Sequence, residues 1–107
     1  MKKEYIEVLL SSSAEIIEFK NTFSDLGYAD EEVIGENWFK VFIKSEEYIE
    51  IFKVFSELFQ HNHKKWKTYG NDIICKDGSL KCIDFSNEII DLNGELFMKF
   101  IGVEKHS

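Results

Sequence analysis

Cys75 and Cys82 are the only cysteines of the 107-residue chain and its most reactive side chains. They flank Asp77-Gly78, a dipeptide typical of hairpin turns, so they are predicted on adjacent strands, diagonally placed on one face. Their spacing, and the lack of histidines at matching positions, does not fit a zinc site. We expect two buried, reduced thiols, because a free cysteine behaves as a small apolar side chain. A redox pair is the alternative.

Catalytic machinery is not evident elsewhere in the chain. Asp72, Asp84 and Glu88 are acids within predicted strands, and no spacing brings a histidine to them. Glycine-rich phosphate loops and nucleophile motifs are missing from the sequence. We therefore predict that the chain is not an enzyme. A buried Asp84 with a strongly raised pKa would favour catalysis after all.

The charge balance restricts the classes of partner. The net charge is −7 and the sequence contains no arginine, whereas nucleic-acid binding usually needs a basic face. The only basic cluster, Lys64, Lys65 and Lys67, is interpreted as a solvated loop. We predict no nucleic-acid partner and no metal site.

Apolar runs in the chain are too short for the roughly 20 residues that span a bilayer. The first seven residues carry acids and do not resemble a signal peptide. A cytoplasmic location without direct membrane contact is expected, either alone or as one part of a membrane-anchored sensor.

The first half of the chain predicts a hairpin followed by short helical turns. Residues 5–10 and 16–19 are apolar and β-prone on either side of three serines. Residues 21–26 are predicted as a helical turn that stops at Gly27. Asp30 is the expected N-cap of a second turn over residues 31–34, closed by Gly35. Residues 37–43 form an apolar patch on irregular chain or one helical turn.

Residues 45–60 are predicted to form the only long helix. Ser45, Glu46 and Glu47 suit its N-terminus, where the amides are exposed. One apolar stripe at helical spacing faces the core, and three further apolar residues widen it. The stripe comprises Tyr48, Ile51, Phe52, Phe55 and Phe59, widened by Ile49, Val54 and Leu58.

Three strands complete the chain, over residues 66–76, 80–90 and 96–103, with turns at Asp77-Gly78 and Asn93-Gly94. The last strand is apolar on both faces, which is typical of a central or doubly covered strand. The pattern as a whole predicts an α+β domain with one antiparallel sheet and its helices on one face.

The motifs of the chain resemble those of PAS domains, small sensory modules of bacterial signalling proteins. The resemblance covers about residues 5–104 of a single domain, 1–107. It is carried by Leu26-Gly27-Tyr28, by residues 31–39, by Lys76-Asp77-Gly78-Ser79 and by the ending Phe100-Ile101-Gly102-Val103-Glu104. It implies a five-stranded antiparallel sheet in the order 2-1-5-4-3, with short helices and one longer helix on one face.

Two departures from the family pattern concern the loop after the second strand and the chain end. Phe19 stands where relatives often carry Asn-Pro-Ala, and Asn21 comes slightly later. Glu104-Lys105-His106 replaces the usual Asp-Ile-Thr, whose aspartate commonly ties the domain to its effector. Effector sequence does not follow Ser107, so we expect the effector in another part of the same protein or in a partner.

Some members of the family bind flavin or haem, and the residues that hold these cofactors can be compared with the residues of this sequence. Photoactive flavin-binding relatives need a cysteine where Trp38 stands, so covalent flavin is not expected. Haem-binding relatives often place a histidine within the long helix, whereas His61 and His63 fall at its end. The cofactor is therefore unknown, and non-covalent flavin or a small metabolite is left open.

In this fold the pocket lies between the sheet and the helices. The candidate ligand-binding residues are Trp38, Phe39, Phe42, Ile51, Phe52 and Phe55 from the helices and Ile83, Phe85, Asn87 and Met98 from the sheet. Asn87 would be the polar anchor. An alternative interpretation is that these residues are ordinary core, since protein interiors pack densely and aromatic stripes usually serve that purpose.

Two functional hypotheses follow from the resemblance. The first is a signal-input module that senses a small molecule and acts on an effector of the histidine kinase or diguanylate cyclase type. The second is a ligand-free module for dimerisation and protein interaction. A homodimer is expected in either case, since two-fold assembly is the commonest kind.

Overall fold

The computed structural model describes residues 4–61 and 67–105. Five antiparallel strands form one sheet in the order β2-β1-β5-β4-β3, as predicted. The strands are β1 (Ile6–Ser11), β2 (Ile16–Asn21), β3 (Thr68–Ile74), β4 (Leu80–Leu92) and β5 (Glu95–Glu104). The helices are α1 (Asp30–Val33), α2 (Trp38–Phe42), the 3-10 turn η1 (Ser45–Glu47) and α3 (Tyr48–His61).

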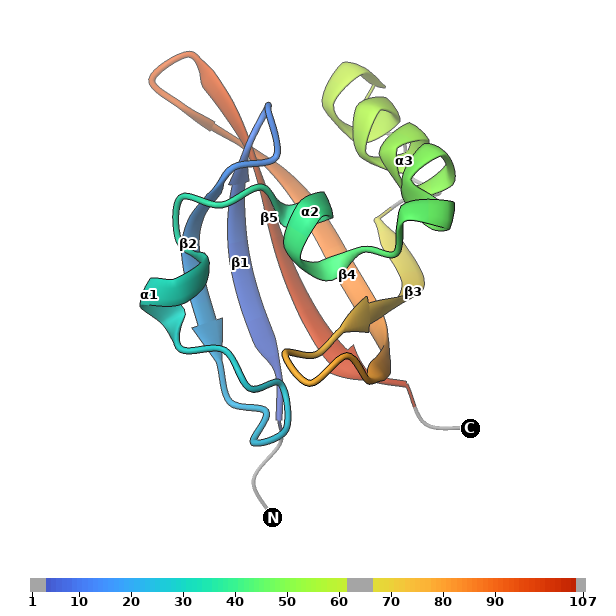
Figure 1. The fold of residues 1–107 in the computed structure, drawn as a ribbon. Helices are drawn as coiled ribbons and strands as arrows, with labels where there is room; N and C mark the ends of the chain where they lie inside the picture. Colours follow the sequence, from blue (N-terminus) through green and yellow to red (C-terminus); the bar gives the residue numbers. More distant parts are fainter. Residues whose placement is uncertain (1–3, 62–66, 106–107) are drawn as a thin grey trace.

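The three α-helices cover one face of the sheet, with α3 lying over β4, α1 beside β2, and α2 in front of β5 and β4 (Figure 1). β5 is central, between β1 and β4, as its two apolar faces predicted. Between sheet and helices lies one buried apolar cluster. Alternation along β4 places Ile83 and Phe85 inside this core and Asp84 outside, exposed to solvent. Asp84 therefore lacks the burial that would have favoured catalysis.

The opposite face of the sheet carries half-buried apolar side chains on its central strands. Leu9 of β1 and Phe97 and Val103 of β5 are half-buried there, and Ile101 of β5 is 43% exposed. An ion pair of 3.2 Å joins Lys99 of β5 to Glu7 of β1 among them. No helix within residues 4–61 and 67–105 covers this face.

The predicted helical turn over residues 21–26 is wrong, because a side chain directs the backbone there instead. The Asn21 amide oxygen accepts a hydrogen bond from the Phe23 N–H at 2.9 Å, and its amide nitrogen donates to the Phe23 carbonyl. Asn21 thus organises the loop after β2. In this sequence Asn21 comes slightly later than the Asn-Pro-Ala that relatives often carry there. Gly27 has the expected positive φ, +89°. Ala29, not Asp30, precedes the helix as N-cap.

The long helix begins later than predicted. Residues 45–47 form the 3-10 turn η1, and the regular helix starts at Tyr48. The Ser45 hydroxyl donates to the Glu46 carboxylate rather than accepting from a helix amide, so its predicted capping role is wrong. Ile51, Val54, Phe55 and Leu58 form the buried face of α3.

The two cysteines are both free, but they differ in environment. Cys75 is buried, whereas Cys82 lies exposed on the outer face of β4, opposite Asp72 of β3. Cys75 points toward the core, as Ile73 does, whereas Cys82 points toward solvent. The two thiols therefore lie on opposite faces of the sheet, and the prediction that both are buried on one face is wrong for Cys82. Partial shielding by neighbouring atoms and the hydrogen bond and charge of Asp72 raise the pKa of the Cys82 thiol.

Several predicted features lie outside the described residues. They are His63, Lys64, Lys65 and the start of the third strand at Trp66, together with His106 of the chain end. Within the described residues, none of the helices has the length and the apolar run that crossing a membrane requires.

Candidate ligand cavity between α3 and the sheet

A mostly apolar cavity lies between α3 and the inner face of the sheet. Its volume is about 50 Å³. One water needs roughly 10–15 Å³, so the space corresponds to a few atoms. The walls come from α2, α3 and four strands, and consist of Leu10, Trp38, Phe39, Ile51, Val54, Phe55, Leu58, Tyr69, Asn71, Phe85, Asn87, Met98 and Phe100.

One short helix places the two aromatic residues at the centre of the cavity wall. The Asn37 side-chain oxygen accepts hydrogen bonds from the N–H groups of Phe39 (2.9 Å) and Lys40 (3.2 Å), and so caps α2. This cap fixes the position of Trp38 and Phe39 just inside the helix. The Trp38 ring packs edge-on against Phe100 of β5, with centroids 4.8 Å apart.

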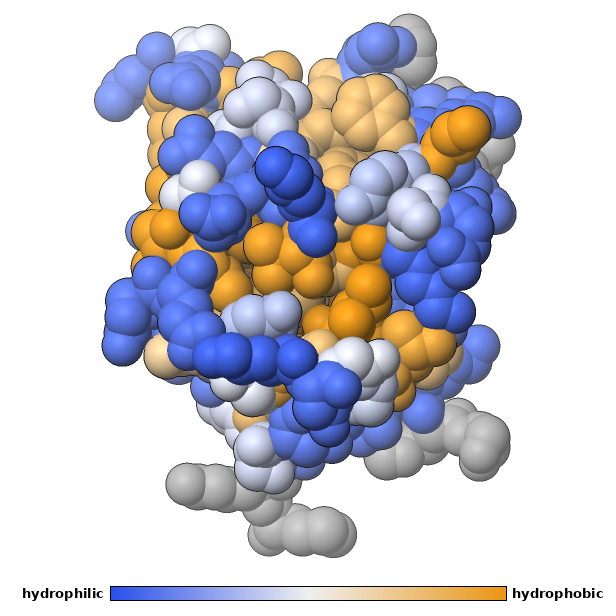
Figure 2. Space-filling model, in the orientation of Figure 1, coloured by the Kyte–Doolittle hydropathy of each residue, from blue (hydrophilic) through white to orange (hydrophobic). Residues whose placement is uncertain are grey.

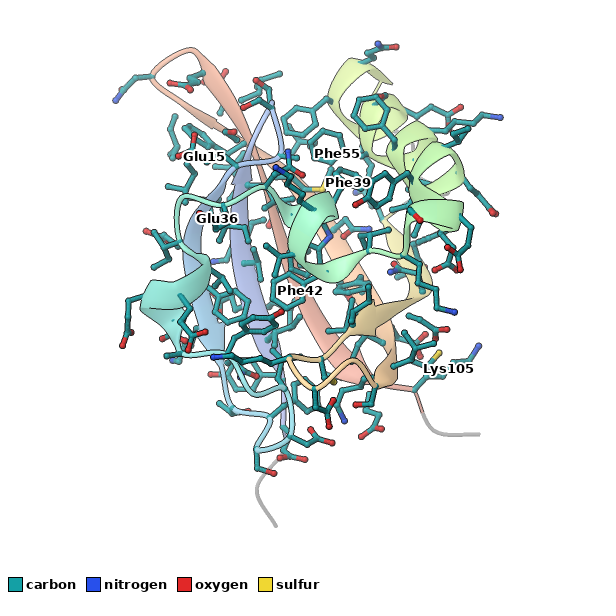
Figure 3. The ribbon with its side chains drawn as sticks, in the orientation of Figure 1. Glu15, Glu36, Phe39, Phe42, Phe55 and Lys105 are labelled. Atoms are coloured by element: carbon teal, nitrogen blue, oxygen red, sulfur yellow. The ribbon has the colours of Figure 1, made fainter. Side chains whose placement is uncertain are left out.

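α3 forms the lid of the cavity. Phe55 of α3 meets Phe39 of α2 edge-to-face, with ring centroids 5.6 Å apart, and the two labelled rings lie next to each other in Figure 3. Ile51, Val54 and Leu58 lie on the same side of α3. Figure 2 shows apolar residues reaching the surface on this side of the molecule, between the helices. The lid therefore rests on apolar contacts along its length.

The cavity has a polar side on the outermost strands. Tyr69 and Asn71 of β3 and Asn87 of β4 contribute a phenol and two carboxamides to the lining. Burial and the nearby carboxylates of Glu50 and Glu47 raise the pKa of the Tyr69 hydroxyl. The Asn87 backbone N–H donates to the Lys67 carbonyl at 2.7 Å. These groups could orient a ligand through hydrogen bonds, while the other walls offer only apolar contact.

Seven of the ten predicted site residues line the cavity: Trp38, Phe39, Ile51, Phe55, Phe85, Asn87 and Met98. The other three do not. Phe42 is fully buried against Phe19 and Trp38, and lies away from Phe39 and Phe55 in Figure 3. Phe52 is 53% exposed on the outer side of α3. Ile83 is buried beneath Gly102 instead.

Six lining residues were missed by the sequence analysis: Leu10, Val54, Leu58, Tyr69, Asn71 and Phe100. Strand alternation would have found three of them, because Asn71 and Tyr69 share the inward direction of Ile73, and Phe100 shares that of Met98. Leu10 had no such signal, since its place at the cavity depends on the pairing of β1 with β5.

The cavity, at about 50 Å³, is small compared with a flavin or a haem. Ligand pockets usually measure roughly 300–1,000 Å³, so a flavin or a haem does not fit unless α3 moves. Trp38, which stands at the position of the photoactive cysteine, directs its indole into the aromatic core. Among the described residues no cluster of histidine, cysteine and acids could hold a metal ion.

Comparisons with known proteins identify the fold. No family model matches the sequence, and no curated protein does. The PAS domain of the RpfR quorum-sensing receptor from Cronobacter turicensis, in complex with C12:0, is 22% identical with a TM-score of 0.73, over 99% of this chain and 97% of that one.

Two further solved structures agree with this result. A PAS domain from Desulfitobacterium hafniense is 15% identical with a TM-score of 0.76, over 98% of this chain and 94% of that one. A PAS domain from a two-component sensor histidine kinase is 13% identical with a TM-score of 0.74, over 94% and 85% of the two chains. The chain has the PAS fold, as its motifs predicted.

Proposed function

We propose that the chain is a sensory input module that binds a small, largely apolar molecule in the cavity beneath α3. The observation that carries the proposal is the cavity itself, which lies between a lid helix and the sheet and has polar groups on one side only. The neighbouring RpfR domain in complex with C12:0 supports the assignment of a ligand to this fold. The lining residues named above are the proposed ligand contacts.

Binding would act on the position of α3. A ligand larger than a few atoms needs more than the present space, so α3 must move outward from β4 and β5 to admit it. A ligand shifts the conformational equilibrium only by its difference in affinity between the two positions. The change would then reach an effector of the histidine kinase or diguanylate cyclase type, in the same protein or a partner, in the cytoplasm. The neighbouring kinase domain supports this kind of effector.

Mass spectrometry and melting temperature test the proposal together. Native and denaturing spectra of freshly purified protein show whether a molecule leaves on denaturation, and a metabolite library is then screened for compounds that raise the melting temperature. Val54→Phe fills the cavity from α3 and should abolish the ligand-dependent rise. Ile49→Phe, on the same helix at a residue that is 89% exposed, is the matched control and should retain it.

A clean mass, together with no stabilising compound in the library, would contradict the ligand proposal. Retention of the full rise by Val54→Phe would place the ligand elsewhere on the molecule.

A second candidate function is homodimerisation through the outer face of the sheet. Ile101 favours this candidate, because its side chain is 43% exposed between half-buried apolar neighbours. No helix of the described residues covers this face of the sheet. Ile101→Glu should convert a dimer into a monomer in native mass spectra, and Ile49→Glu should not. A monomeric wild type at tens of micromolar would contradict this candidate.

A further inference from the structure

The floor and one side of the cavity beneath α3 are closed by tightly packed structure. Leu10, Met98 and Phe100 lie on β1 and β5, and the backbone pairing of these two strands leaves no passage through the sheet. Under α2, the Trp38 ring packs against Phe85 and Phe100, with centroids 6.2 Å and 4.8 Å apart. A path from solvent to the cavity therefore runs past the helices.

The seam between α2 and α3 is closed by aromatic rings in two layers. The inner layer is Phe39 of α2 and Phe55 of α3, both buried, which line the cavity and meet edge-to-face with centroids 5.6 Å apart (Figure 3). The outer layer consists of Tyr48, Phe52 and Phe59 of α3, which are not among the lining residues. Tyr48 and Phe59 are half-buried and Phe52 is exposed, so rings extend from the cavity wall to the solvent.

Phe52 is the outer ring that contacts both members of the inner layer. Its centroid lies 5.6 Å from that of Phe39 and 5.9 Å from that of Phe55, although its side chain is 53% exposed. Tyr48 meets Phe39, at 6.3 Å, and Phe59 meets Phe55, at 4.8 Å. From the solvent side, Phe52 therefore supports the two rings that close the cavity.

Such a seam can open by movement of side chains, without a change in the helices. Exposed side chains change rotamer within about picoseconds to nanoseconds. A single ring pair is a weak interaction, so the loss of one outer ring matters for the pair beneath it. When Phe52 turns toward solvent, Phe39 and Phe55 lose a shared neighbour and can move apart.

We propose that an apolar ligand enters and leaves the cavity through the seam between α2 and α3, with Phe39 and Phe55 as the gate and Phe52 as the residue that holds the gate closed. The inference rests on the proposed function, which assigns a ligand to this cavity. It adds the route and the residue that sets the rate of exchange. An outward movement of α3 on binding would widen the same seam.

Thiol labelling tests the route without any ligand. Met98→Cys places a thiol in the cavity wall, and Cys82→Ser removes the exposed native thiol. Cys75, which is buried but is not among the lining residues, remains as an internal reference. The full chain is treated with methyl methanethiolsulfonate, a small neutral reagent, at several urea concentrations below the unfolding transition. Mass spectrometry of peptides then gives the labelling rate at each site.

Urea separates opening of the seam from unfolding of the domain. Local opening exposes little surface, so labelling through it should hardly depend on urea, whereas labelling through global unfolding rises steeply with urea. We expect urea-independent labelling at position 98 that is faster than labelling of Cys75. Phe52→Ala should raise this urea-independent rate about five-fold, which corresponds to about 1 kcal/mol. Ile101→Ala, on the outer face of the sheet, is the matched control and should leave the rate unaltered.

Each contrary outcome overturns the route and leaves binding in the cavity to its own test. A rate unchanged by Phe52→Ala would place the entry elsewhere on the molecule. An equal rise in Ile101→Ala would mean that general destabilisation, and not the seam, controls access. Labelling at position 98 with the urea dependence of Cys75 would show that the cavity opens only with the whole domain. The melting temperatures of the wild type and Val54→Phe with added compounds test the proposed function separately.

Discussion

Gly102 illustrates how a single residue sets the packing of this sheet. It pairs with Phe85 of β4 on one side and Ile6 of β1 on the other, near the C-terminal end of the central strand β5. A Cβ atom added there would come within 2.6 Å of Ile83 Cγ2 and 2.9 Å of Phe85 Cε1. The Gly-Val motif that linked the sequence to PAS domains therefore has a steric cause: the core side chains of β4 occupy the space a side chain would need.

We expect Gly102→Ala to lower the free energy of unfolding by about 1–3 kcal/mol, the usual range for overpacking a tight core. The reason is that Ile83 and Phe85 must shift within a core that is already filled. Urea unfolding followed by tryptophan fluorescence measures the change. Ile101→Ala, one residue earlier on the outer face, is the control and should cost about 1 kcal/mol or less, since that side chain is 43% exposed. Equal urea midpoints for Gly102→Ala and the wild type would contradict this account.

At the scale of elements, the sequence predicted the sheet better than the helices. Strand alternation and the Asp-Gly and Asn-Gly turns located all five strands, and Asn93 and Gly94 have the positive φ values, +57° and +88°, that a tight hairpin needs. Such signals depend only on neighbours in sequence. The turn after β2 was mistaken for a helix because hydrogen bonds of one side chain, Asn21, decide its course.

The rotation of α3 could not be predicted for a different reason. Apolar residues occupy so much of its circumference that the sequence allows several stripes to face the sheet. In the structure Ile51 and Phe55 point inward, whereas Phe52 is 53% exposed and Ile49 is 89% exposed. Phe52 was therefore included among the candidate ligand-binding residues although it lies on the outer side of α3. The extent of the cavity likewise depends on where α3 rests, which explains why Ile83 lies outside it although Phe85 of the same strand lines it.

The two phenylalanines of α3 provide a direct test of this rotation. Phe55→Ala should lower the free energy of unfolding by about 3 kcal/mol, because a buried ring is lost between Phe39 and the sheet. Phe52→Ala should cost about 1 kcal/mol or less, since half of that ring already contacts solvent. Both are measured by urea unfolding under identical conditions. A larger loss for Phe52→Ala than for Phe55→Ala would mean that α3 presents a different face to the sheet.

At the scale of the whole molecule, Lys81 joins segments that lie far apart in the chain. Its side chain is only 7% exposed, and its ammonium lies 2.9 Å from Asp25 in the loop before α1 and 3.5 Å from Glu104 at the end of β5. It also lies 5.0 Å from the centre of the Phe23 ring. Glu104 replaces the aspartate of the family pattern, and in this structure its carboxylate is held by Lys81 within the domain.

Lys81→Met removes these ion pairs and keeps most of the aliphatic side chain. We expect a loss of about 1–2 kcal/mol near pH 7, between the values for exposed and buried pairs, because both carboxylates can regain water when the ammonium is removed. Lys99→Met, which breaks a half-exposed pair with Glu7, is the matched control and should cost less than about 1 kcal/mol. Equal losses for the two variants would contradict a special role for Lys81.

The pH dependence of the Lys81 contribution gives a sharper test. Burial opposes the charged ammonium, but hydrogen bonding and attraction to Asp25, together with Glu104, outweigh it and raise the Lys81 pKa above the ordinary 10.5. A raised pKa means that the folded protein holds this proton more tightly than the unfolded chain does. The stabilisation is therefore complete below pH 10.5 and disappears as the pH rises through the folded-state pKa. The difference in unfolding free energy between wild type and Lys81→Met should be constant from pH 7 to 10 and shrink above pH 10.5. A difference that instead shrinks between pH 7 and 9 would show that the ammonium is destabilised by burial, and that Asp25 and Glu104 do not compensate for it.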